Sequence, residues 1–152
     1  MTDAEMILKM IETVDPADTA KLDEIDARVS AYCRHHDKKI PEWVERWPLE
    51  FQARIGVGGN KWRVFVPKEN GEMVIWWKPI KYTRSRDALK AIRPDGWIFD
   101  INWMSGNAYC SVSKGKFSYD DFVSFLAEDL LTEELAELHA VIQAIAHERR
   151  TS

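Results

Sequence analysis

The sequence contains few cysteines, no long apolar run and no large excess of charge. Cys33 and Cys110 are its only cysteines in 152 residues, and so distant a pair is typical of free thiols rather than of a disulfide framework. No apolar stretch approaches the ~20 residues that span a bilayer. The first five residues include Asp3 and Glu5, where a signal peptide carries a basic segment. These absences predict a cytoplasmic protein without a membrane partner.

The overall charge is slightly acidic, with 21 basic and 25 acidic residues and a net charge of −4. This balance argues against a protein that coats nucleic acid or an anionic membrane, because both uses need a cationic surface. The hydrophobic share of 45% and the charged share of 30% are typical of a folded globular chain. We find no repeat or linker, so residues 1–152 are predicted to form a single α+β domain.

No motif for catalysis or metal binding stands out. The glycines between Gly56 and Gly59 precede a predicted strand, whereas a phosphate-binding loop precedes a helix. His35 and His36 are adjacent, and His139 and His147 are eight residues apart. Neither pair has the i, i+4 spacing of helical metal ligands. We therefore predict no catalytic residue, no metal site and no cofactor, and a protein that is not an enzyme.

Apolar periodicity predicts the helices. A first helix ends at Val14, and a second begins with Asp15 as its N-cap and ends before Pro41. In the second helix the acids at 18, 23, 24 and 26 are expected to face water. Trp43 and Trp47 suit a helical turn, and further helices are predicted over 85–92 and 119–128 and from the N-cap Thr132 onward.

Alternating and β-branched segments predict the strands. Two turn signals, 58–60 and 67–71, separate strands over 51–57, 61–66 and 72–77, which gives a three-stranded antiparallel meander. A hairpin is predicted on either side of Ser105-Gly106-Asn107. Together these elements predict an α+β fold in which an antiparallel sheet of about five strands is layered between helices.

The last helix carries an apolar seam at 4, 3, 4, 3 spacing. Its members are Leu131, Leu135, Leu138, Ile142 and Ile145. The seam can pack either on the sheet or on a second copy of the chain, so a homo-oligomer is one of two alternatives.

The stretch from Trp76 to Arg86 combines aromatic rings with cations. Residues 61–93 hold nine basic residues against three acidic ones, which is an excess of six positive charges in an acidic chain. One interpretation is structural, with one indole in the core and the cations in water. The other is a binding surface for a nucleotide, nucleic acid or an acidic protein. Its candidate residues are Trp76, Trp77, Lys78, Lys81, Tyr82, Arg84 and Arg86.

Four short stretches resemble the phage ABA-sandwich domain family. They are residues 82–89 (YTRSRDAL), 94–97 (PDGW), 108–110 (AYC) and 135–140 (LAELHA). The similarity runs over about residues 22–149, so the helix of residues 1–14 is an addition, and residues 41–80 are richer in tryptophan than expected. The resemblance implies an antiparallel sheet layered between helices and a phage or prophage context inside a host cell. It implies no active site.

The leading functional hypothesis is a phage- or prophage-derived accessory protein that acts by binding. It would block a host protein or sequester a nucleotide-like small ligand, and counter-defence is one such use. The alternative is a nucleic-acid-binding protein of phage replication or regulation, for which strong salt dependence is expected. An unrecognised hydrolase and a virion component are the remaining hypotheses.

Overall fold

The computed structural model describes residues 1–33, 48–56, 61–67 and 73–151. At residues 50, 66–67 and 73–77 it describes the backbone and not the side chains. Several predictions concern other residues and therefore lie outside the described part: the end of the second helix, the turn with Trp43 and Trp47, His35 and His36, and both turns of the predicted meander.

The two N-terminal helices form as predicted, with one correction at a cap. Helix α1 spans Asp3–Thr13 and begins with a capping box, in which the backbone N–H of Glu5 donates to the hydroxyl of Thr2 at 3.1 Å. Helix α2 spans Thr19–Cys33. Its first turn is capped by Asp18, whose carboxylate accepts the N–H of Lys21 at 3.1 Å. Asp15 instead closes the preceding turn, since its carboxylate accepts the N–H of Ala17 at 2.9 Å.

The first sheet is the predicted antiparallel meander. After a short helix α4 (Leu49–Gln52), strands β1 (Ala53–Ile55), β2 (Trp62–Pro67) and β3 (Met73–Trp77) pair in the order β1-β2-β3. The strand predicted from residue 51 begins two residues later, because Phe51 and Gln52 belong to α4.

The second sheet contains one strand that was predicted as a helix. Helix α5 (Arg86–Ile92) leads into the predicted hairpin of β4 (Trp97–Met104) and β5 (Asn107–Lys114). Residues 123–130 then form β6 (Val123–Leu130), which pairs antiparallel with β5, and helix α6 (Glu133–Thr151) completes the chain. The helix predicted over 119–128 is therefore wrong. Phe125 and Ala127 alternate with exposed neighbours, the period of a half-buried strand.

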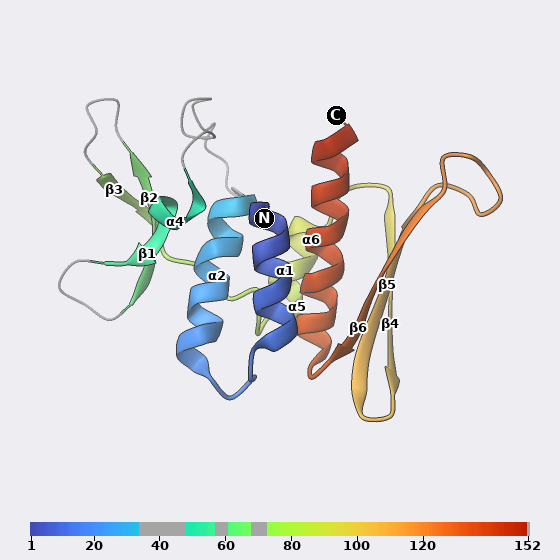
Figure 1. Cartoon of the computed structure of the whole chain (residues 1–152), viewed down its shortest axis with the longest axis horizontal. Coiled ribbons are helices and arrows are strands. Elements are labelled where there is room, and N and C mark those ends of the chain that lie inside the picture. Colours follow the sequence, from blue (N-terminus) through green and yellow to red (C-terminus); the bar gives the residue numbers. More distant parts are fainter. Residues whose placement is uncertain (34–47, 57–60, 68–72, 152) are drawn as a thin grey trace.

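The helices lie between the two sheets. Figure 1 shows α1, α2 and α6 in the middle, with strands β1 to β3 on one side and β4 to β6 on the other. Helix α2 packs on β1 and β2, α6 packs on β4, β5 and β6, and α1 contacts both helices. The fold is α+β, as predicted. The described residues form two three-stranded sheets, however, and not one sheet of about five strands.

Most of the predicted apolar seam packs inside the chain. Leu135, Leu138 and Ile142 are at most 1% exposed, Ile145 is partly buried, and their helix contacts β5, β6 and α1. Leu131 precedes α6 and is 55% exposed, so its place in the seam was predicted wrongly. Of the two alternatives for this seam, the structure shows packing on a sheet. In β5, the alternating residues Ala108, Cys110 and Val112 are buried in the same core. Across the residues that the structure describes, no helix is both long and apolar enough to cross a bilayer.

Candidate anion-binding site

A basic connection, defined here as residues 78–85, carries the chain from β3 to α5. It is fastened to α2 by two long-range hydrogen bonds. The N–H of Ile80 donates to the hydroxyl of Ser30 at 3.0 Å, and the N–H of Thr83 donates to the carboxylate of Asp26 at 2.8 Å. These bonds pair backbone groups that would otherwise be unsatisfied in the interior. The connection is therefore held at two points along α2.

Asp26 is the central group of this attachment. It was expected to face water, but it is only 1% exposed, so that prediction is wrong. Its second carboxylate oxygen accepts a hydrogen bond from Arg84 at 2.7 Å. Burial raises the pKa of Asp26, while the hydrogen bonds from Thr83 and Arg84 act in the opposite direction. The same guanidinium nitrogen of Arg84 lies 2.5 Å from Asp23, which is half exposed. Arg84 therefore joins two carboxylates of α2.

Helical spacing contained a signal for the burial of Asp26. Leu22, Asp26 and Ser30 follow each other at intervals of four, so they lie on one face of α2. All three are buried. Reading that face as continuous would have placed Asp26 toward the interior and would have required a buried partner for its carboxylate.

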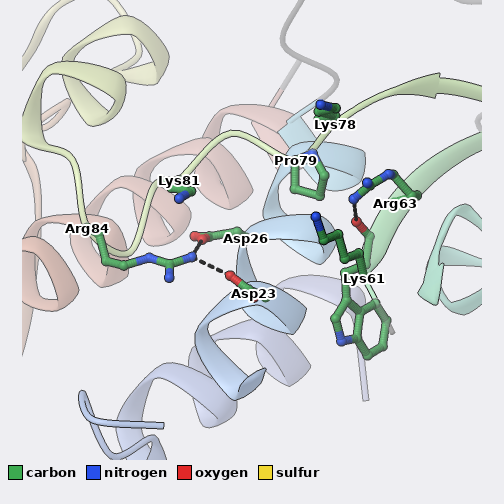
Figure 2. A pocket seen from close by; sticks show the side chains of 9 residues that line it. Asp23, Asp26, Lys61, Arg63, Lys78, Pro79, Lys81 and Arg84 are labelled. Carbon is green, nitrogen blue, oxygen red and sulfur yellow. Dashed lines mark hydrogen bonds and ion pairs between the residues drawn. The ribbon is translucent and has the colours of Figure 1, made fainter. Parts of the chain in front are cut away.

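A pocket of about 280 Å³ opens beside this attachment. Figure 2 shows its walls: Asp23 and Asp26 come from α2, Lys78, Pro79, Lys81 and Arg84 from the basic connection, Arg63 from β2, and Lys61 from the position just before β2. Trp62 also lines it. Five cationic side chains face two carboxylates, so the pocket has a formal charge of +3. It is positive although the chain as a whole has a net charge of −4.

Three of the cations differ from the arginines because they have no ion-pair partner among the residues that the structure describes. Lys61, Lys78 and Lys81 are exposed, and the described residues offer none of them an ion pair. Arg84 is paired with the two acids, and Arg63 donates to the backbone oxygen of Trp62 at 2.8 Å. The pocket therefore combines a hydrogen-bonded network on its α2 side with three ammonium groups that no described acid pairs with.

The structure brings together three of the seven predicted binding residues. Lys78, Lys81 and Arg84 line the pocket. The backbone of Trp76 and Trp77 lies in β3, but their side chains are outside the described part, so their exposure stays a prediction. Lys61 and Arg63 were counted in the local charge and were not named as candidates. Lys61 and Arg63 lie beside the basic connection because of how strand β2 is placed against α2, which the local sequence does not specify.

Two predicted binding residues lie elsewhere. Tyr82 is fully buried, and burial raises the pKa of its hydroxyl. It belongs to the core because the turn at the connection directs Tyr82 and Thr83 inward, while Lys81 and Arg84 on either side are exposed. Arg86 points to α6, where it lies 3.2 Å from Glu133 and 3.6 Å from the buried Glu137. Both residues serve the packing of the chain, and neither lines the pocket.

The other reactive groups show the features of structural residues. Cys33 and Cys110 are free thiols, as predicted. Burial raises the pKa of each to about 12, so both are protonated at neutral pH and poor nucleophiles. His139 is buried between Glu12, at 3.0 Å, and Gln143, at 2.9 Å, where it joins α1 to α6. Within the described ranges, no three or more acidic, histidine or cysteine side chains cluster as metal ligands would.

Comparisons with known proteins add no relative. Neither the protein-family models, nor the curated proteins, nor the solved structures contain a match to this chain. The resemblance to the phage ABA-sandwich family therefore stays a prediction, and the function has to be inferred from the pocket itself.

Proposed function

We propose that the protein is a binding protein that holds a small phosphate-bearing ligand in the basic pocket. The observation that carries this proposal is the convergence of Lys61, Lys78 and Lys81, three ammonium groups without ion-pair partners among the described residues, on one concavity. An ammonium group donates up to three hydrogen bonds and is a common phosphate ligand.

The size of the pocket favours a small ligand over a protein surface. Its volume of about 280 Å³ is near the lower end of the roughly 300–1,000 Å³ that is typical of small-molecule sites. Asp23 and Asp26 form one wall and repel negative charge. A compact anion can keep to the lysine side, whereas an extended polyanion would also meet the two carboxylates.

The biological setting of this binding is proposed from the sequence resemblance alone. A phage or prophage accessory protein that acts without catalysis can interfere with its host by sequestering a phosphorylated ligand. Counter-defence is a use of that kind. The pocket supports the binding step, and the resemblance supports the setting.

The binding step is tested by calorimetric titration with ribose 5-phosphate and with inorganic pyrophosphate at low salt. Lys78→Gln and Lys81→Gln should each raise the dissociation constant about tenfold, the effect of losing ~1.4 kcal/mol from one charge-assisted hydrogen bond. Lys90→Gln is the matched control, because Lys90 is exposed on α5 and does not line the pocket. It removes the same charge and should leave binding unchanged.

Two results would defeat the proposal. One is the absence of binding heat for both probes, and the other is an equal effect of the control and the pocket variants, which would indicate a general effect of net charge. A single-stranded oligonucleotide serves as a further probe. If it binds with a steep loss of affinity on adding salt and the small probes do not bind, the nucleic-acid alternative replaces the proposal.

A further inference from the structure

The pocket contains an aromatic side chain that a simple phosphate would not use. Trp62 begins β2, where it pairs with Ile55 of β1. Its indole is partly buried against the core and also lines the pocket. A partly exposed indole beside free ammonium groups offers a flat apolar surface next to a site for negative charge.

The indole is supported from α2. The guanidinium carbon of Arg28 lies 5.9 Å from the centre of the Trp62 ring, within the range of a cation–π contact. Arg28 is in turn 3.6 Å from Glu24. Arg28 is not one of the residues that line the pocket, whereas Trp62 is. Trp62 is thus supported from α2 and remains partly exposed beside the pocket.

We infer that the ligand is a nucleotide, with its base stacked on Trp62 and its phosphate held by Lys61, Lys78 and Lys81. This inference rests on the proposed function and adds the chemical class of the ligand. The two carboxylates of α2 set the orientation, because they repel the phosphate and leave it on the lysine side. The volume of about 280 Å³ limits the occupant to roughly a single nucleotide unit.

The inference is tested by comparing ligands that share the phosphate and differ in the base. AMP, GMP, CMP and UMP are titrated beside ribose 5-phosphate, which lacks a base. At least one purine nucleotide should bind roughly 5- to 150-fold more tightly than ribose 5-phosphate, the gain expected from stacking one base on an aromatic side chain. Calorimetry is the suitable readout, since the chain has seven tryptophans whose fluorescence would overlap.

Two substitutions at Trp62 separate stacking from folding. Trp62→Leu should raise the dissociation constant of the nucleotide to about that of ribose 5-phosphate and leave the latter unchanged. Trp62→Phe keeps an aromatic face and should retain part of the preference. Circular dichroism and the thermal midpoint check that both variants fold. If Trp62→Leu does not fold, the comparison of Trp62→Phe with the wild type tests stacking by itself.

The outcomes distinguish this inference from the proposed function. If ribose 5-phosphate binds as tightly as every nucleotide, or if Trp62→Phe weakens both classes of ligand equally, the nucleotide inference is wrong and the phosphate pocket remains. If no phosphorylated probe binds at all, the proposed function fails and this inference fails with it.

Discussion

The hydrogen bonds of Asp26 predict that two substitutions, at the two carboxylates that pair with Arg84, differ in their effect on stability. Asp23→Ala and Asp26→Ala each remove one carboxylate that pairs with Arg84. The two carboxylates differ in exposure, which is 50% for the side chain of Asp23 and 1% for that of Asp26. They also differ in that Asp26 alone accepts the N–H of Thr83. The pair of variants therefore compares a buried carboxylate that also holds the N–H of Thr83 with an exposed one that pairs with Arg84 alone.

The loss in the free energy of unfolding depends on which polar groups each substitution leaves without a partner. Without Asp26, the buried N–H of Thr83 has lost its acceptor, which costs about 1–3 kcal/mol. Arg84 keeps Asp23 and is 31% exposed, so its loss is screened by water and adds at most ~1 kcal/mol. We expect Asp26→Ala to lower the free energy of unfolding by about 1–4 kcal/mol. Asp23→Ala removes an exposed pair and should lower it by about 0–1 kcal/mol.

Urea unfolding at neutral pH, followed by circular dichroism, measures both values. With a slope of about 2 kcal/mol per molar urea, the middle of the range for a small domain, Asp26→Ala should move the midpoint down by roughly 0.5–2 M. Asp23→Ala should leave the midpoint nearly unchanged. If the two variants lose equal stability, Asp26 does not fasten the basic connection to α2, and the account of that attachment is wrong.

Three further predictions follow from other buried or paired groups. The hydroxyl of Tyr82 is buried without a hydrogen-bond partner among the described residues. Tyr82→Phe should therefore keep or raise the thermal midpoint and leave the binding of ribose 5-phosphate unchanged. A lower midpoint would indicate a hydrogen-bond partner for the hydroxyl, and weaker binding would indicate that the hydroxyl contacts the ligand. A hydrogen bond from Lys114 lowers the pKa of Glu148 below its usual 4.5, so the stability that this carboxylate adds is present above pH 4.5 and is lost as the pH falls through the lowered value. Thermal midpoints measured down an acid series should therefore fall more steeply in the wild type than in Glu148→Gln, and parallel curves would contradict this. Neither Cys33 nor Cys110 should react with a thiol reagent such as dithiobis-nitrobenzoate at pH 8 before urea unfolds the chain, and a rapid reaction of one equivalent in the native state would show that a thiol is accessible.

The elements that could be predicted from sequence are those fixed by neighbours along the chain. The capping residue Ser85 accepts the N–H of Ala88 in the first turn of α5, and Thr132 does the same for Leu135 in α6. The β4–β5 hairpin turns at Gly106, which has a φ of 83° that glycine adopts without strain. Each of these signals acts within four residues, so each is visible in the sequence.

Strand β6 shows why a local pattern of residues was not sufficient to distinguish a strand from a helix. The acids at 120, 121 and 128 and the apolar residues between them fitted an amphipathic helix about as well as a strand. What decides the outcome is the partner, because β5 offers a free edge on which Val112 pairs with Phe125 and Ser113 with Ser124. Gly115, with a φ of 87°, lets the chain turn back, and a side chain there would lie 3.0 Å from the backbone oxygen of Asp121.

The sequence predicted a cluster of cations at this place in the chain, but only some of the residues that line the pocket. A local excess of cations identified the connection at Lys78, Lys81 and Arg84. It could not separate the free lysines from the paired arginine, because the acids that engage Arg84 lie about 60 positions earlier in the chain, at Asp23 and Asp26. Long-range pairs of this kind depend on how α2 meets the first sheet, which no local pattern contains.

If the pocket binds phosphate as proposed, the same acids should limit which ligands it accepts. A phosphomonoester carries roughly −1.5 to −2 charges near neutral pH, which the formal charge of +3 more than balances. Each further phosphate adds negative charge, and a chain of phosphates long enough to pass the lysines approaches Asp23 and Asp26. Because Arg84 is already paired with both acids, it offers little compensation. The pocket should therefore gain little from a second or third phosphate, which separates a single-nucleotide site from a groove that follows a nucleic-acid backbone.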